Sequence, residues 1–163
     1  MAHTQLATYL NDHLAGSVAA LELMEQLEAG HAGTPLARCI AGVREDVQAD
    51  RQELEALMGR LQVAPSRTRK ATAWVTEKLT ALKLRLDDPA GGALRVLEAL
   101  DVLSLGIEGK ASLWRALHAA AEATPELQGM DYDELVKRAA DQRGRLEVER
   151  LEAAKQALRA ADS

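Results

Sequence analysis

Three charged residues near the C-terminal end of the chain, Arg143, Glu147 and Arg150, fall on the apolar side of a predicted helix. At about 100° per residue, they share one stripe with the apolar residues of that helix. Those apolar residues are Tyr132, Val136, Ala139, Ala154, Ala157 and Leu158. Charged groups enter a protein core only when they are paired or bind something, so the pattern predicts an ionic site inside the protein.

Three more polar residues follow the apolar stripes of the helices predicted upstream. His13 lies within the stripe of the first helix, Asp50 lies on that of the second, and Glu108 flanks that of the third. A rise of about 1.5 Å per residue brings them to similar heights near the middle of a helical bundle. We therefore expect a central ion network that consists of His13, Asp50, Glu108, Arg143, Glu147 and Arg150.

The composition indicates a single all-α domain over residues 1–163. The chain has no Phe, two Trp and two Tyr, which suits long helices packed through aliphatic side chains and disfavours β-sandwiches. The single Cys39 cannot form an internal disulfide, and no apolar run approaches the roughly 20 residues of a membrane span. A net charge of −5 argues against nucleic-acid binding. We expect a cytoplasmic protein without a transmembrane segment.

Capping residues and chain breaks divide the sequence into four long helices and a connector. Thr34 followed by Pro35 predicts the start of the second helix, and a capping box of Asp131 and Glu134 predicts the start of the fourth. The breaks after the first and third helices are short, so each pair should form an antiparallel hairpin. The helices are expected over residues 4–29, 34–62, 89–123 and 131–161, with a helical connector over 66–86.

The connector between the second and third helices is too long for an up-down-up-down bundle. If it crosses the length of the bundle, these two helices run parallel. In helix order and crossover, over nearly its whole length, the chain resembles the ferritin-like superfamily of four-helix bundles. The resemblance implies a ferritin-like four-helix bundle with a long helical crossover between helices 2 and 3, and a di-iron or di-manganese centre at mid-bundle.

The metal-ligand pattern of that superfamily is degenerate here. A di-metal centre of this kind takes a Glu from each of two helices and Glu-x-x-His from each of the other two. In this chain Glu147 is followed by Arg150 in the histidine position. Arginine has no lone pair for a metal, but its guanidinium can supply the positive charge of one. We expect a buried ion network without a cofactor; the alternative is iron or manganese bound by His13, Asp50, Glu108 and Glu147.

The predicted core-facing stripes also lead to expectations about single residues. Glu147→Gln should destabilise the protein far more than Glu149→Gln, because Glu149 points away from the predicted core. His118 lies on the core stripe of the third helix, where a lone histidine is usually a hydrogen-bonded packing residue. Gly106 and Gly109 of the same helix are expected to mark close contacts between helices.

The connector carries a run of basic residues in an otherwise acidic chain. Together with a tryptophan, this pattern can mark a helix that binds an acidic partner or an anionic membrane surface. More often it marks a helix that packs its apolar residues on the bundle and leaves its basic face solvated. The candidate partner-binding residues are Arg67, Arg69, Lys70, Trp74 and Lys78.

Three functions are open on this basis. We expect a non-catalytic ferritin-like bundle with a buried ion network in place of a di-metal centre, acting as an interaction or stress-related protein, with a second copy of the chain as a partner through an exposed helix face. The first alternative is a di-iron or di-manganese oxidoreductase or metal-storage protein. The second alternative is a peripheral binding module that uses the basic connector helix.

Overall fold

The computed structural model describes residues 4–66 and 92–159 of the chain, and these residues form an all-α bundle without strands. The elements are α1 (Thr4–Gly30), α2 (Pro35–Arg60), α4 (Gly92–Ala120), the short 3-10 helix η1 (Pro125–Leu127) and α5 (Tyr132–Ala157). The all-α prediction is therefore confirmed for this part of the chain. The basic connector, with its candidate partner-binding residues, lies outside the described residues.

The predicted capping residues begin the helices as expected. The Thr34 side chain accepts a hydrogen bond from the backbone N–H of Ala37 at 3.2 Å, and Pro35 occupies the first position of α2. The Asp131 side chain accepts a hydrogen bond from the backbone N–H of Glu134 at 3.0 Å and begins α5. Capping chemistry thus locates the helix starts to within a residue.

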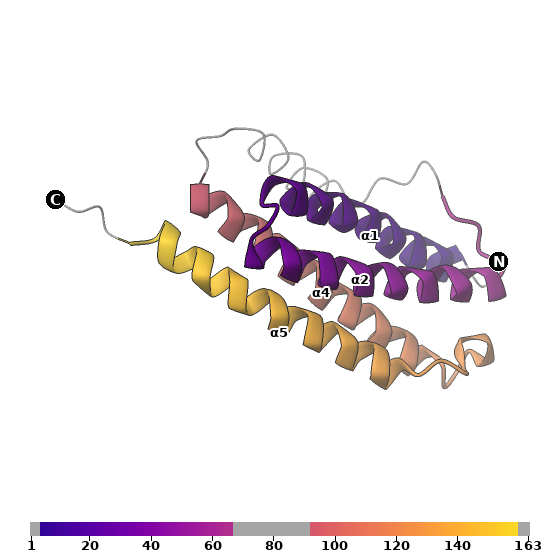
Figure 1. The fold of residues 1–163 in the computed structure, drawn as a ribbon. Coiled ribbons are helices and arrows are strands. Elements are labelled where there is room, and N and C mark those ends of the chain that lie inside the picture. Colours follow the sequence, from indigo (N-terminus) through magenta and orange to yellow (C-terminus); the bar gives the residue numbers. More distant parts are fainter. Residues whose placement is uncertain (1–3, 67–91, 160–163) are drawn as a thin grey trace.

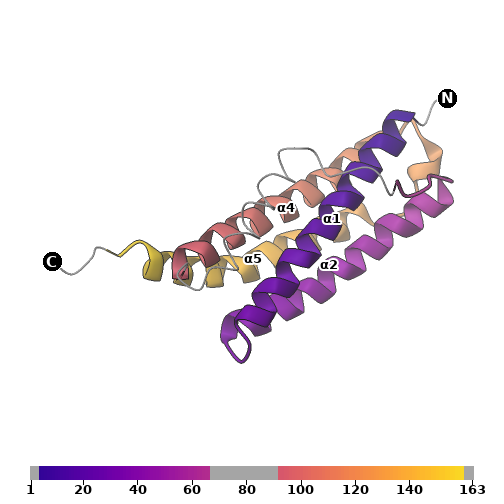
Figure 2. The same ribbon diagram turned by 90° about the horizontal axis from the view of Figure 1, so that it is seen from above.

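Two antiparallel hairpins, α1–α2 and α4–α5, make up the bundle, and α2 and α4 run in the same direction (Figure 1). α2 packs against α5 and α1 packs against α4, so the parallel pair α2 and α4 is diagonal. The two hairpins lie at an angle to each other (Figure 2). α2 ends at the opposite end of the bundle from the start of α4, and the predicted crossover between them lies outside the described residues.

The apolar core consists of two clusters, one in each half of the bundle. One cluster is centred on Leu23, Met24, Leu27, Ile40, Val43, Leu100, Leu103 and Leu146. The other is centred on Leu10, Leu54, Leu57, Met58, Leu113, Trp114, Leu117 and Leu135. On α2 the clusters are separated at Asp50, which lies between Val47 of one and Leu54 of the other. A polar layer therefore crosses the middle of the core.

The packing of α1 on α4 is much less extensive than that of α4 on α5. Gly106 and Gly109 of α4 do not mark close helix contacts, because a Cβ atom added at either would meet nothing within 4 Å. That prediction is wrong: the helices leave open space at these positions instead of approaching closely. None of the described helices has the length and apolar character needed to cross a bilayer.

Candidate functional site

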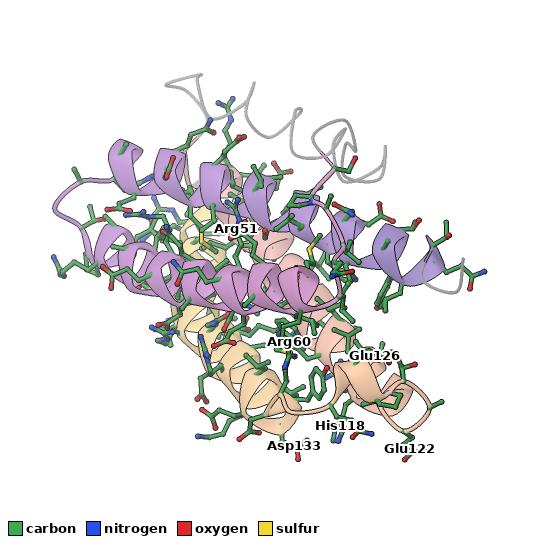
Figure 3. The ribbon with its side chains drawn as sticks, turned by 90° about the vertical axis from the view of Figure 1, so that its right-hand side faces the viewer. Arg51, Arg60, His118, Glu122, Glu126 and Asp133 are labelled. Atoms are coloured by element: carbon green, nitrogen blue, oxygen red, sulfur yellow. The ribbon has the colours of Figure 1, made fainter. Side chains whose placement is uncertain are left out.

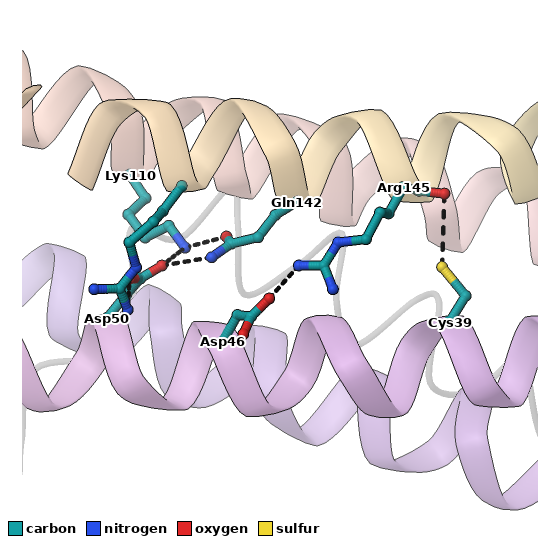
Figure 4. A network of polar contacts seen from close by, with 7 residues as sticks. Cys39, Asp46, Asp50, Lys110, Gln142 and Arg145 are labelled. Carbon is teal, nitrogen blue, oxygen red and sulfur yellow. Dashed lines mark hydrogen bonds and ion pairs between the residues drawn. The ribbon is translucent and has the colours of Figure 1, made fainter. Parts of the chain in front are cut away.

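The polar layer is built around Asp50 of α2, whose side chain is 0% exposed. The Lys110 ammonium of α4 donates a hydrogen bond to Asp50 Oδ2 at 2.5 Å and another to Gln142 Oε1 of α5 at 2.5 Å. The Gln142 amide nitrogen donates to the same Asp50 oxygen at 2.7 Å. These three side chains form a closed triangle that joins α2, α4 and α5 (Figure 4). We call it the Asp50 triad.

A second cation reaches Asp50 from α5. Arg138 Nη2 lies 2.6 Å from Asp50 Oδ1, which is close enough for an ion pair. The geometry is not that of a hydrogen bond, because Asp50 Oδ1 has no hydrogen-bond partner. Arg138 therefore contributes charge at this oxygen rather than a directed contact. Two positive groups face one buried carboxylate, and the cluster carries an excess of one positive charge.

Burial and charge act in opposite directions on Lys110. Burial lowers its pKa, because an ammonium loses its hydration in the core. Asp50 opposes this effect by charge and hydrogen bonding, whereas Arg138 adds to it by repulsion. One turn along α2, Asp46 pairs with Arg145 of α5 at the edge of the layer (Figure 4). The ionic contacts between α2 and α5 thus run from the surface into the core.

The core-facing stripe of α5 lies one residue away from the predicted one. Its buried residues are Tyr132, Leu135, Ala139, Gln142, Leu146 and Ala153. Gln142 and Leu146 directly precede Arg143 and Glu147, so the predicted stripe is rotated by about 100°. The prediction that Arg143, Glu147 and Arg150 face the core is wrong. Only Tyr132 and Ala139 are common to the predicted and observed buried sets.

These charged residues instead form two ion networks on the outer face of the α4–α5 hairpin. Glu108 accepts from Arg143 at 2.5 Å and from Arg115 at 2.6 Å, and all three side chains are more than 40% exposed. Arg150 binds Glu147 at 2.6 Å and Asp101 at 3.1 Å. Surface pairs of this kind contribute little to stability, so neither network replaces a buried metal. The expected central network therefore divides into separate sites.

His13 lines the same cavity as Asp50 and Lys110 but is not a member of the Asp50 triad. Its ring makes an edge contact with Tyr9 at 4.7 Å, and burial lowers its pKa while the charge of Asp12 partly opposes the shift. The structure does not bring His13, Asp50, Glu108 and Glu147 together as the metal alternative requires. Within residues 4–66 and 92–159, no three His, Cys, Asp or Glu side chains form a group that could hold a metal ion.

His118 and Cys39 lie at separate positions in the bundle and differ in exposure. The His118 side chain is 58% exposed at the end of the bundle, where it stacks on Tyr132 and lies 3.6 Å from Asp133 (Figure 3). The expectation that it packs in the core is wrong, because most of the side chain is exposed and only its ring face contacts Tyr132. Cys39 is half-buried, and burial raises the pKa of its thiol. A thiol of this kind is a weak nucleophile.

Sequence reasoning missed Lys110, Arg138 and Gln142. Lys110 follows the core stripe of α4, since it lies three residues after the buried Ile107 and four before the buried Trp114. Gln142 lies three residues after Ala139 and four before Leu146. The signal was present at both positions, but a polar residue between apolar neighbours looks like a solvated position until its partner is known.

Comparisons of this chain with models of protein families, with curated proteins and with solved structures find no match. The described residues define the class of fold, an all-α four-helix bundle in which α2 and α4 run parallel. The site is a buried carboxylate neutralised by basic side chains of two other helices.

Lys110→Met tests whether the triad is a buried ion pair. The substitution leaves the fully buried Asp50 carboxylate with Arg138 and Gln142 alone, and breaking a buried pair from one side costs on the order of 3 to 5 kcal/mol. Chemical denaturation should show this loss. Lys137→Met is the matched control, since the Lys137 side chain is 69% exposed and should change the unfolding midpoint little. Equal midpoints for the two variants would contradict a buried pair.

Replacing all three residues of the Asp50 triad tests whether an apolar layer can stabilise the bundle in its place. Changing Asp50 and Gln142 to Leu and Lys110 to Met should recover much of the stability that Lys110→Met loses, because an apolar layer has no charged group to desolvate. Arg138 is partly exposed and can turn to solvent. A triple variant less stable than Lys110→Met would show that the layer cannot be packed with apolar side chains.

The predicted and the observed core-facing stripes of α5 lead to opposite expectations for the substitution of Glu147. Its carboxylate lies at the surface, so Glu147→Gln and Glu149→Gln should unfold at nearly the same denaturant concentration. Asp50→Asn should unfold well below both, since it removes the charge that two cations face in the core. A large loss of stability in Glu147→Gln alone would instead support the core-facing stripe predicted from the sequence.

The outer network gives a pH signature at Glu108. The hydrogen bond from Arg115 holds the pKa of this carboxyl below its ordinary value, with Arg143 adding to the effect. The stability from this pairing is present above the ordinary carboxyl pKa and is lost as the pH falls through the lowered one. Arg115→Gln should therefore raise the Glu108 pKa, as measured by carbon-13 NMR of the carboxyl group. An unchanged titration would contradict the pairing.

Proposed function

We propose that this protein is a non-catalytic, ferritin-like four-helix bundle in which the Asp50 triad stands in place of a di-metal centre. The observation that carries the proposal is the Lys110 ammonium, which lies 2.5 Å from both Asp50 Oδ2 and Gln142 Oε1 in the middle of the bundle. The parallel course of α2 and α4 supports the ferritin-like part of the proposal. In such folds, the middle of the bundle is where the metal ligands converge.

A side-chain cation changes what the centre can do. Lys110 and Arg138 already neutralise the one carboxylate of the layer, and a metal ion placed there would meet two like charges. A covalently attached ammonium has no redox states and no open coordination position. The site therefore supports the fold and does not supply electrons or activate oxygen.

This arrangement fits an interaction protein, which binds a partner and catalyses no reaction. The metal-dependent oxidoreductase or storage protein remains the alternative in which His13, Asp50, Glu108 and Glu147 move together. The contacts of the described residues favour the first proposal, since basic partners hold Asp50 in the core and other basic partners hold Glu108 at the surface. The second alternative, a peripheral binding module, depends on the basic residues of the connector. A pull-down with the charges of those residues reversed tests it.

Metal analysis distinguishes these functions. Protein purified from cells supplemented with iron and manganese should contain well under one equivalent of either metal, as measured by elemental analysis. Its melting temperature should not change with a chelator, because a ligand stabilises a protein only in proportion to ln(1 + [L]/Kd). Stoichiometric metal together with a chelator-dependent melting temperature would overturn the proposal. A Lys110→Met sample measured in parallel shows whether removing the ammonium admits a metal.

A further inference from the structure

A cavity of about 330 Å³ lies beside the Asp50 triad, mainly between α1 and α4 with α2 as its floor. Its walls are predominantly aliphatic, and three helical glycines face it where side chains would otherwise fill the space. The main apolar wall residues are Ala20, Met24, Val47, Leu54, Val102, Leu103, Ile107, Leu113 and Trp114, and the glycines are Gly16, Gly106 and Gly109. Its volume lies at the lower end of pockets that bind small molecules, about 300 to 1,000 Å³.

The glycines are not needed for close packing. A Cβ atom at Gly16, Gly106 or Gly109 would meet no other atom within 4 Å. Glycine inside a helix is less favourable than alanine, so three glycines on one cavity weaken α1 and α4 without any steric reason within the described residues. What they provide is room for an occupant between the two helices.

Lys110 and Trp114, both on the cavity wall, can donate hydrogen bonds to an occupant. Lys110 Nζ carries three N–H groups, and Asp50 and Gln142 account for two of them. The indole N–H of Trp114 is buried and has no hydrogen-bond partner. A buried donor without an acceptor is unfavourable, so an oxygen atom that accepts from the Trp114 indole would remove a penalty already present.

The two donors are one turn apart on the same face of α4. Residues at positions i and i+4 of a helix have Cβ atoms about 5 to 6 Å apart, and both Lys110 and Trp114 line the cavity. A carboxylate has two oxygens that can accept from two such donors at once. The excess positive charge at Asp50, Lys110 and Arg138 adds attraction for an anion, and Asp12, which also lines the cavity, partly opposes it. Arg51, also on the wall, is already paired with Glu55.

We propose that this cavity binds a medium-chain aliphatic monocarboxylate, with the carboxylate at Lys110 and Trp114 and the alkyl chain between α1 and α4. The class follows from the volume, which suits a medium chain better than a long one, from the aliphatic walls and from the two donors. The site is independent of whether the triad replaces a metal centre. It would make the protein a carrier or sensor of such acids.

Isothermal titration of the full chain with decanoate, kept below its aggregation concentration, tests the proposal. We expect one equivalent to bind and to raise the melting temperature. Because a charge-assisted hydrogen bond is worth about 1.5 to 3 kcal/mol, decanoate should bind about ten-fold or more tightly than 1-decanol, and decylammonium should bind more weakly still. No binding of decanoate, or binding of decylammonium at equal affinity, would overturn the proposal.

Substitutions at two glycines test whether decanoate binds in this cavity. Gly109→Leu puts a side chain into the cavity and should abolish decanoate binding or weaken it at least ten-fold. Gly144→Leu is the matched control: Gly144 is an exposed helical glycine of α5 with open space around its Cβ position, and it does not line the cavity. Both variants should fold, since each replaces a helical glycine with a better helix former. Equal decanoate affinity in the two would overturn the proposal.

The role of Lys110 is tested without leaving a buried charge alone. In the double variant Asp50→Asn with Lys110→Met, both charges of the pair are removed and the apolar walls are kept. Decanoate should then lose most of its preference over 1-decanol, because the charge-assisted donor is gone, while 1-decanol should bind as tightly as it binds to the wild type. A double variant that still prefers decanoate ten-fold would overturn the assignment of the carboxylate to Lys110.

Discussion

The burial of one carboxylate constrains much of this bundle. An ionised Asp in an apolar core is very unfavourable unless its oxygens are bonded and its charge is balanced. Asp50 is satisfied only when Lys110 of α4 and Gln142 of α5 reach the same height of the bundle as α2. The requirement therefore sets the relative positions of three helices along the bundle, which aliphatic packing by itself leaves free to slide.

The site also explains why the core has two parts. Apolar clusters pack above and below the polar layer, and each is complete within its own half of the bundle. Helix α1 contributes no side chain to the triad and meets α4 over a short contact beside the cavity. Its attachment comes mainly from α2, through their antiparallel packing. Helix α1, which contributes nothing to the ionic layer, is thus one of the three helices that border the cavity.

The sequence predicted the helices well and the site only in part. Caps such as Thr34 and Asp131 act within one helical turn, so they can be recognised without knowing the tertiary structure. On α2 the apolar stripe is continuous, and Asp50 is its one charged member. On α5 the large aliphatic residues are few, and the choice between the stripe of Gln142 and that of Arg143 depends on a partner, Lys110, which is 32 residues away in the sequence.

The closed triangle of Asp50, Lys110 and Gln142 has an evolutionary consequence. A change at one corner leaves a buried polar group without its partner, so substitutions at these three positions should occur together in related sequences. Relatives that keep the ionic layer should carry an acid in the second helix, a lysine in the helix after the connector and an amide in the last. Relatives in which all three positions have become apolar would record the loss of the layer in a coordinated step.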